Sequence, residues 1–481
     1  MAVLALDIGT SSARAVVFDG RGQRLGQEGQ TRYQTVTTAQ GGAQLSAPAV
    51  RDGLYQAIDQ ALESVDQRID AVGTSCFWHS FLAMSRQGRA RSMVYTWEDR
   101  SFRGSLSAMA TALDREAYRQ RTGCHLHPSY PLAKVAGWRL AGRPLEVAGS
   151  FSAYLVGQLF GEVAEGISMA SASGFLNRHS RAWDGPAMAA AGIGPSAMPA
   201  LGEGWMPFRL RPGLARRWPK LGQARWLFPI GDGAAASLSS QGRADTAVLS
   251  LGTSGALRRL TAEMPEQLPG PLFCYLLDQR RAVVGGALSG GGNALAWLHQ
   301  VARLPEWETA ATLLNRRPIG LGSVLLWPHL AGMRSPTWEW DASGAVLGLS
   351  LATQPVDLLG AVVEAVCLDF RTVFLALQSV LPARRVEASG GALAAVERWP
   401  QLLADALGAA VTVPEDPEGS AWGAARLAFE RLGEATGRGS GRRRRYRPRA
   451  GGEAAFARLE ARRLAVEGQL GAIWTLLGKG D

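Results

Sequence analysis

Apolar and polar positions alternate in the same way at two places about half a chain apart. Residues 3–6 and 13–18 are apolar runs around Asp-Ile-Gly-Thr-Ser-Ser, and residues 247–251 and 256–260 flank Gly-Thr-Ser-Gly. Each pattern predicts two antiparallel strands joined by a short turn, rather than a strand–helix–strand unit. Gly9 corresponds to Gly252 in this internal repeat, so the chain is predicted to contain a duplicated domain.

Stretches with helical spacing alternate with short strand-like runs after each predicted hairpin. Residues 50–65, 356–381 and 399–407 are rich in Ala and Leu, and residues 453–477 have the pattern of a closing amphipathic helix. This alternation predicts an α/β protein. We place the domain boundary near Gly242, giving domains 1–242 and 243–481, and the lack of a low-complexity linker indicates that they are closely hinged.

Composition supports two globular cores and argues against several classes of protein. The 481 residues are 47% apolar and 19% charged, enough for two domains. No run approaches the roughly 18 apolar residues of a membrane helix, and the start lacks a signal sequence, so we expect a cytoplasmic protein without a membrane partner. The four cysteines are widely spaced, which favours reduced buried thiols over disulfides or zinc.

The excess of positive charge is concentrated near the end of the chain. Much of the formal net charge of +10 lies in residues 438–449, which include four consecutive arginines. No aromatic platform or recognition motif accompanies this run, so we expect a solvated loop and no nucleic-acid partner.

The two Gly-Thr-Ser turns are predicted phosphate sites. Small residues leave backbone N–H groups and hydroxyls accessible to a phosphate, although an ordinary hairpin turn has the same composition. The residues concerned are Thr10, Ser11, Ser12, Gly252 and Thr253. Asp7 ends the first strand and could hold Mg²⁺ through water or form an Asx turn, whereas the repeat has Ser250 in its place.

Asp232 is the predicted catalytic base. It lies between Gly231 and Gly233, after an apolar run and before a small-residue segment typical of a helix. An N-cap role would explain the aspartate as well. A helix N-terminus should keep the pKa of this carboxyl low, and an ionised Asp in a cleft can accept the proton of an attacking hydroxyl.

Two further glycine turns are predicted to contact a nucleotide. Gly390 and Gly391 follow an apolar strand, and a turn ending at Gly292 precedes a helix. Bare backbone would let a purine lie flat on it, although tight strand-to-helix turns need the same residues.

Together these motifs resemble the FGGY carbohydrate kinase family over nearly the whole chain. The matching segments in family order are Asp7 to Ser12, Tyr95 to Arg100, Thr122-Gly123 with Lys134, Gly231 to Gly233, Ser250 to Gly255, Ala331 to Pro336 and Ser389 to Ala392. The resemblance implies two duplicated actin-like (ribonuclease H-like) domains with an interdomain cleft. It also implies ATP-dependent phosphorylation of a primary hydroxyl on a small-molecule sugar substrate, with ATP and Mg²⁺ required.

The resemblance implies roles for individual residues as well. Asp232 would be the base and, with Asp7, would lie near the metal, while phosphate would contact Thr10, Ser11, Ser12, Gly252 and Thr253. Adenosine would contact Gly390 and Gly391, and the turn ending at Gly292 is expected to flank the nucleotide. Acceptor binding would fall to the first domain, at Trp78, His79, Trp97, Asp99, Arg100 and Asp232. His79 could equally be a core histidine, and Asp99 with Arg100 a surface ion pair.

Departures from the family pattern affect the predicted substrate. Phe77 and Trp78 stand where the family commonly has Gln and Met, while Met333 and Ala392 replace a common Glu and Gly. A wide apolar face should disfavour a small triol, so we expect a five- or six-carbon sugar, sugar acid or polyol, with gluconate or a ketopentose such as xylulose first. A non-catalytic actin-like or chaperone-like nucleotide switch, or a degenerate kinase acting as a binding module, is the alternative. The protein could form a homodimer.

Overall fold

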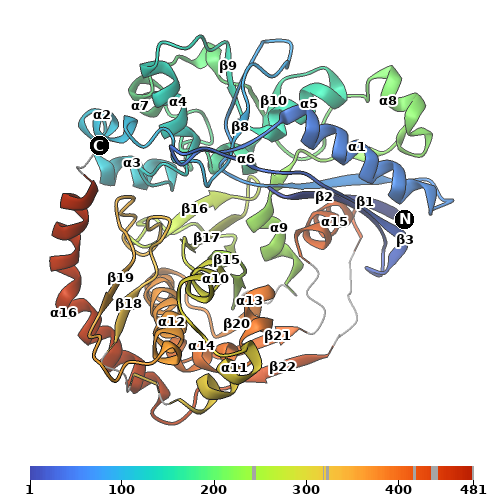
Figure 1. The fold of residues 1–481 in the computed structure, drawn as a ribbon. Coiled ribbons are helices and arrows are strands. Elements are labelled where there is room, and N and C mark those ends of the chain that lie inside the picture. The colour runs from blue at the N-terminus through green and yellow to red at the C-terminus, as the bar shows by residue number, and fades with distance from the viewer. Residues whose placement is uncertain (241–244, 318, 321–323, 415–418, 435–441, 479–481) are drawn as a thin grey trace.

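The computed structural model describes the chain except for residues 241–244, 318, 321–323, 415–418, 435–441 and 479–481. It is an α/β structure with two main sheets, one in each half of the chain, which lie next to each other with helices around them (Figure 1). Gly242 lies outside the described residues, so the exact domain boundary stays a prediction.

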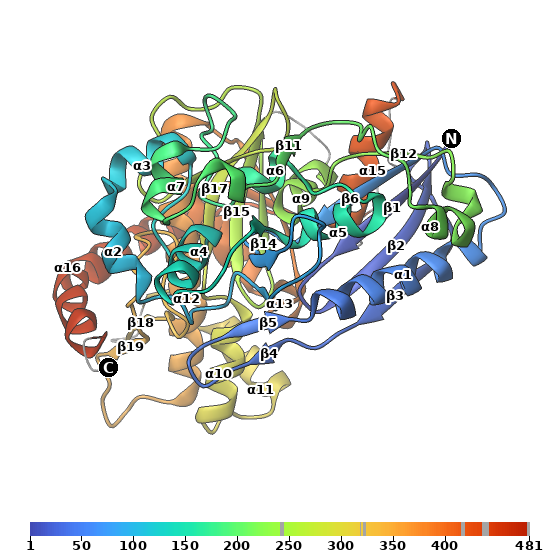
Figure 2. The same ribbon diagram turned by 90° about the horizontal axis from the view of Figure 1, so that it is seen from above.

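The first sheet is formed by the N-terminal hairpin and the strands that follow it. Its order is β12-β6-β1-β2-β3, with β13 also paired to β6. The strands are β1 (Ala2–Ile8), β2 (Ser12–Asp19), β3 (Arg24–Arg32), β6 (Ala71–Cys76), β12 (Arg225–Trp226) and β13 (Ile230–Gly231). Helix α1 (Ala47–Glu63) packs along β2 and β3 (Figure 2). Asp7 and Asp232 therefore end neighbouring parts of one sheet.

The second sheet repeats the core of the first. Its order is β16-β17-β15-β14-β20-β21-β22. The strands are β14 (Thr246–Leu251), β15 (Gly255–Thr261), β16 (Phe273–Leu276), β17 (Ala282–Leu288), β20 (Arg385–Ser389), β21 (Ala410–Pro414) and β22 (Arg443–Tyr446). In each sheet an antiparallel hairpin pairs through its first strand with a parallel strand and through its second with an antiparallel one. The repeat predicted from the two Gly-Thr-Ser turns is thus present in the fold.

The main helices lie close to where the apolar spacing predicts them. They are α12 (Pro355–Val380), α14 (Trp399–Leu407) and α16 (Gly452–Gly478) in the second half. Buried apolar side chains of α12 and α14 form one core with those of the second sheet, while the first sheet and α1 have their own. Within the described residues, no helix has the length and apolarity needed to cross a membrane.

The other helices surround these cores. In the first half they are α2 (Ser105–Ala112), α3 (Arg115–Thr122), α4 (Pro131–Leu140), α5 (Phe151–Phe160), α6 (Ile167–Ser171), α7 (Gly185–Ala190) and α8 (Pro212–Arg217). In the second half they are α10 (Gly292–Val301), α11 (Trp307–Arg316) and α13 (Gly391–Ala395). Short strands pair outside the main sheets: β4 (Val36–Thr37), β5 (Ala43–Leu45), β7 (Leu82–Met84), β8 (Val94–Tyr95), β9 (Val147–Gly149), β10 (Ala164–Gly166), β11 (Ala200–Gly202), β18 (Leu325–Trp327) and β19 (Ala345–Leu347).

A helix from late in the chain packs against the first sheet. Helix α15 (Ser420–Arg431) contacts α9 (Asp232–Ser239) and strands β1 and β6. Gly423 makes this contact close, because a Cβ there would lie 1.8 Å from the carbonyl oxygen of Ala235. At the start of α15, Ser420 donates a 2.6 Å hydrogen bond to Asp7. The chain therefore returns to the first domain beside the turn predicted to bind phosphate.

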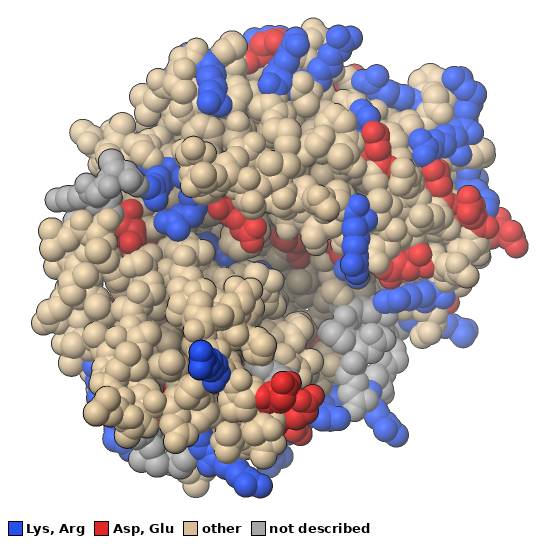
Figure 3. Space-filling model, in the orientation of Figure 1, with Lys and Arg blue, Asp and Glu red and all other residues tan. Residues whose placement is uncertain are grey.

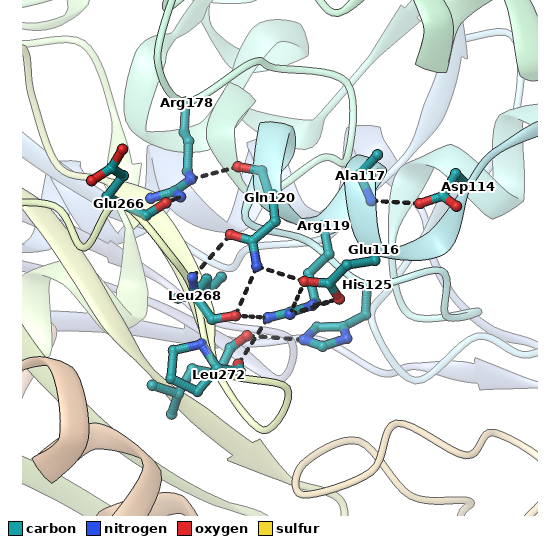
Figure 4. A network of polar contacts seen from close by, with 11 residues as sticks. Asp114, Glu116, Ala117, Arg119, Gln120, His125, Arg178, Glu266, Leu268 and Leu272 are labelled. Atoms are coloured by element: carbon teal, nitrogen blue, oxygen red, sulfur yellow. Dashed lines mark hydrogen bonds and ion pairs between the residues drawn. The ribbon is translucent and has the colours of Figure 1, made fainter.

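A second connection between the halves is a network of side chains that donate to backbone carbonyls (Figure 4). Arg178 donates to the carbonyls of Pro265 and Glu266 at 2.8 and 2.9 Å. Gln120 exchanges two 2.9 Å hydrogen bonds with the backbone of Leu268. The loop before β16 is thereby held against the first half, which positions β16 at the boundary between the domains.

The middle of the basic run is a strand rather than the expected loop. Arg443 to Tyr446 form β22, which pairs with β21 at the sheet edge, while residues 438–441 lie outside the described residues. Arg443 also contacts Glu387 at 3.2 Å. Exposed charged side chains suit an edge strand because they discourage pairing with another chain.

Candidate active site

A cavity of about 140 Å³ lies between the two halves, and the surface is hollowed between them (Figure 3). Trp78, His79, Trp97 and Asp232 line it from the first half. From the second half its lining includes Ser250, Arg258, Phe273, Tyr275 and Arg334. Four predicted site residues from three separate segments thus face one cavity.

Asp232 is the first residue of α9 and is partly buried in the cavity wall. Its carboxylate accepts a 2.7 Å hydrogen bond from the N–H of Gly233. The expectation of a low pKa is wrong in direction: burial raises the pKa of Asp232, and the charge of Arg258 and the Gly233 N–H oppose this only in part. A raised pKa makes the carboxylate a better proton acceptor while it is ionised.

Tight packing explains the glycines on both sides of this aspartate. A Cβ at Gly231 would lie 1.8 Å from the Trp78 ring, and one at Gly233 would lie 2.4 Å from it. Trp78 itself donates a 3.2 Å hydrogen bond to the carbonyl of Ser168. The Gly-Asp-Gly motif therefore lets an indole pack directly against the segment that carries Asp232.

His79 is held in a defined orientation at the cavity. Its Nδ1 lies 2.8 Å from the carbonyl oxygen of Ala172, so Nδ1 carries the proton and Nε2 is an acceptor. Burial lowers the pKa of His79 to about 3, so the ring is neutral. Its backbone has a φ of 61°, in the left-handed region that non-glycine residues rarely adopt. A neutral acceptor in a constrained position suits a sugar hydroxyl.

Trp97 lines the cavity, whereas Asp99 and Arg100 have other contacts. Asp99 is 1% exposed and accepts hydrogen bonds from the N–H of Ala43 at 2.8 Å and from Ser101. Arg100 donates to the carbonyl of Trp340 at 2.8 Å. Neither residue is among those that line the cavity. Asp99 thus stabilises the loop that presents Trp97, and direct acceptor contact by Asp99 or Arg100 stays a prediction.

The sequence reasoning did not assign the cations and phenols of the second half. Arg258 lies on β15 and donates a 3.2 Å hydrogen bond to Ser250. Arg334 packs on Trp97, with its guanidinium carbon 4.5 Å from the ring centroid. Tyr275 on β16 lies 2.6 Å, oxygen to oxygen, from Tyr130. The position of Arg334 in the Gly-Met-Arg-Ser-Pro segment was the available signal for one of them.

A second cavity, of about 880 Å³, brings together the glycine turns of the second half. Gly252, Thr253, Gly292 and Gly391 all line it, together with Trp297. The Gly292 N–H donates a 2.8 Å hydrogen bond to the carbonyl of Gly252, which joins two of the turns. The predicted phosphate and adenosine residues of this half are therefore neighbours around one space large enough for a nucleotide.

Gly390 has a structural reason to be glycine. Its φ is 124°, and a Cβ there would lie 2.2 Å from the carbonyl oxygen of Leu251. At Gly391 and Gly252, by contrast, a Cβ would meet no atom within 4 Å. Gly390 allows the strand end to approach the phosphate turn, while Gly391 and Gly252 leave open space beside it.

The first phosphate turn lies apart from both cavities' lining residues. Ser11 is exposed and Thr10 and Ser12 are partly exposed. Tyr33 donates a 2.5 Å hydrogen bond to the carbonyl of Gly9, which fixes the turn. Asp7, below it, is paired with Arg14 and accepts from Ser420. No cluster of three or more potential metal-ligating side chains occurs among the described residues.

A carboxylate in one cavity and a second, glycine-lined cavity large enough for a nucleotide fit the arrangement of a two-domain phosphotransferase. The N-terminal domain of the FGGY family of carbohydrate kinases matches residues 2–206, and the C-terminal domain of that family matches residues 247–430. The chain belongs to the FGGY family of carbohydrate kinases, and its family implies the use of ATP.

Individual relatives and structures agree with this assignment. Gluconokinase of Bacillus licheniformis is 29% identical over 461 residues, covering 90% of this chain and 88% of the relative. Gluconokinase of Bacillus subtilis is 29% identical over 456 residues, with the same coverage. The crystal structure of gluconate kinase from Lactobacillus acidophilus superposes with a TM-score of 0.87 at 20% identity, over 98% of this chain and 99% of that one. The predicted actin-like (ribonuclease H-like) two-domain fold is thereby confirmed.

Proposed function

We propose that this carbohydrate kinase transfers the γ-phosphoryl group of ATP to a primary hydroxyl of gluconate or a closely related five- or six-carbon sugar acid. The observation that carries the proposal is the cavity in which Asp232 faces two arginines and aromatic walls. The two gluconokinase relatives support the choice of acceptor. A ketopentose such as xylulose is the second candidate, favoured by the aromatic faces of Trp78 and Trp97, which pack against neutral sugar rings and chains.

Asp232 is the proposed base of the reaction. It orients the primary hydroxyl and takes its proton as the oxygen attacks the γ-phosphorus and ADP departs. His79 accepts a hydrogen bond from another hydroxyl through Nε2, while Trp78 and Trp97 exclude water from the apolar side of the acceptor. Asp99 and Arg100 hold the loop that carries Trp97. Their direct contact with the acceptor, expected from the sequence, stays a prediction.

The nucleotide is proposed to lie mainly in the second half. Gly252 and Thr253 would contact phosphate, and Gly292, Gly390 and Gly391 would border the adenosine. Thr10, Ser11 and Ser12 would approach the phosphates from the first half when the domains close. In this division residues 1–242 bind most of the sugar and residues 243–481 bind the nucleotide, while side chains of the second half complete the acceptor cavity.

Mg²⁺ fits beside the carboxylates only through water. Both Asp7 oxygens already have partners, Arg14 and Ser420, and Asp232 is bonded to Gly233. Mg²⁺ commonly keeps several waters and binds few protein carboxylates when phosphates are present. Asp7 and Asp232 would hold such a hydrated ion, which when bound supplies positive charge to the phosphates.

The cytoplasmic location and the oligomeric state of the protein are also proposals. Four buried, unpaired cysteines are consistent with the reducing cytoplasm. A homodimer stays a prediction.

A substrate panel tests the proposal. Purified protein with ATP and Mg²⁺ is assayed for ADP release with gluconate, other aldonates, xylulose, ribulose, glucitol and glycerol. We expect gluconate or another aldonate to have the highest kcat/KM. Highest activity with glycerol would contradict the acceptor assignment, and acceptor-independent ATP hydrolysis alone would favour the nucleotide switch.

A further inference from the structure

Two guanidinium groups face the acceptor cavity without a direct ion pair, although the Asp232 carboxylate lines the same cavity. Arg258 and Arg334 both line this space. In the described ranges of the chain, no carboxylate oxygen lies within ion-pairing distance of either group, although many other arginines have such a partner. Burial lowers the pKa of Arg334 to about 10, and the positive charge of Arg258 adds to this shift, so the two cations repel each other.

Neutral groups hold both side chains in place. Arg258 donates to the hydroxyl of Ser250 at 3.2 Å. Arg334 donates to the carbonyl of Leu288 at 2.6 Å, stacks on Trp97, and leaves its buried Nε without a hydrogen-bond partner. Two like charges in a partly buried cavity are unfavourable unless an anion joins them. Ionised Asp232 supplies one negative charge in this cavity, and an anionic acceptor would supply a second.

The duplicated hairpin explains why Arg258 stays without an ion pair. In the first hairpin Asp7 pairs with Arg14. The corresponding residue of the second hairpin is Ser250, and its hydroxyl bonds Arg258 without cancelling the charge. An aspartate at this position would occupy the guanidinium, so the difference between the repeats leaves a cation available in the cavity.

The position of the arginines favours an anionic group of the acceptor over one of the nucleotide. Gly252, Thr253, Gly292 and Gly391, predicted to bind ATP, line a different cavity. The arginines share theirs with Trp97, Tyr275 and Asp232, and the end of the second phosphate turn, Ser254 and Gly255, borders it as well. A guanidinium donates two parallel hydrogen bonds to a carboxylate, which gives orientation as well as affinity.

We propose that Arg258 and Arg334 form a carboxylate subsite that restricts the acceptor to sugar acids and directs their hydroxyl end to Asp232. The inference rests on the proposed sugar-acid kinase activity and adds the residues that determine its specificity. It makes glucitol, which has an alcohol in place of the carboxylate of gluconate, the appropriate probe.

Calorimetric binding without nucleotide tests the subsite directly. We expect wild-type protein to bind gluconate at least about tenfold more tightly than glucitol, because charge-assisted hydrogen bonds are lost with the alcohol. Arg258→Met and Arg334→Met should each weaken gluconate about 10- to 100-fold and leave glucitol nearly unchanged, while Arg258→Lys keeps part of the affinity. Arg259→Met is the matched control, because Arg259 is the next residue on β15 and donates instead to the carbonyl of Pro382.

Separate outcomes distinguish the inference from the proposed function. ATP binding by each variant verifies that it is folded. Phosphorylation of gluconate with unchanged gluconate binding in the arginine variants would overturn the subsite alone. A raised KM for ATP with unchanged gluconate affinity would assign the arginines to phosphate and also overturn it. Equal wild-type binding of gluconate and glucitol, with a neutral sugar as the best substrate, would overturn both.

Discussion

Replacing Asp232 by asparagine isolates its proposed role as proton acceptor. Asparagine has the same shape, and its side-chain oxygen can keep the 2.7 Å hydrogen bond from the Gly233 N–H, so α9 and the Trp78 contact should be preserved. What is lost is the ability to take the hydroxyl proton. General-base catalysis contributes about 10²- to 10⁴-fold, or about 3–5 kcal/mol of barrier.

We therefore expect Asp232→Asn to lower kcat for gluconate by at least about 100-fold. Coupled ADP-release kinetics give kcat, and nucleotide binding measured separately should remain within a few-fold of wild type, because the glycine-lined cavity lies elsewhere. Asp66→Asn is a suitable control, since Asp66 is an exposed aspartate that lines neither cavity. A kcat within about threefold of wild type in Asp232→Asn would refute its assignment as the base.

Four other perturbations follow from the described contacts. Activity should rise with pH as Asp232 ionises, and because Arg258 lowers the pKa of Asp232, Arg258→Met should move this acid limb of the kcat profile to higher pH. Gly252→Val should raise the KM for ATP more than that for the acceptor, because a Cβ at this position meets no protein atom within 4 Å and Gly252 lines the nucleotide space. His79→Ala should raise the acceptor KM and leave that for ATP nearly unchanged. Arg178→Met should lower the free energy of unfolding by about 3–5 kcal/mol in denaturant titrations, because three carbonyls lose a charged donor.

Each of these expectations has a clear contrary result. An acid limb that stays in place in Arg258→Met would mean that another group controls it. Equal effects of Gly252→Val on both substrates would indicate misfolding, and an ATP-specific effect of His79→Ala would remove His79 from the acceptor site. Unchanged stability of Arg178→Met would show that the loop before β16 is held by other contacts.

Local sequence predicted the parts of this molecule that depend on local geometry. The two hairpins follow from apolar runs around Gly-Thr-Ser turns, and their repetition predicts the duplicated sheets. Asp232 at the start of a helix follows from glycine and small-residue patterning. In such segments the backbone conformation and the candidate chemistry depend on the same few residues.

Features that depend on tertiary contacts could not be predicted from local sequence patterns. Arg258 follows buried Ala256 and Leu257 and precedes Arg259 on β15, and only the packing of β15 near α9 shows that it reaches the cavity of Asp232. The sequence pattern predicts Asp99 as a pocket residue, whereas in the structure it accepts hydrogen bonds from the N–H of Ala43 on β5 and from that of Ser101 in its own loop. The direction of the Asp232 pKa depends on burial, which exceeds the stabilisation by the helix start and by Arg258.

The two halves of the duplication have diverged in charge while keeping their strand order. Asp7 is already paired with Arg14 and bonded to Ser420 of α15, so the first hairpin is tied to the helix that returns from the second half. Ser250 leaves Arg258 charged beside Asp232, so the second hairpin supplies a cation to the acceptor cavity. The first hairpin thus contacts the helix from the second half, while the second hairpin faces the acceptor cavity. A movement that closes the domains would therefore bring both phosphate turns and Arg258 closer to Asp232 at the same time.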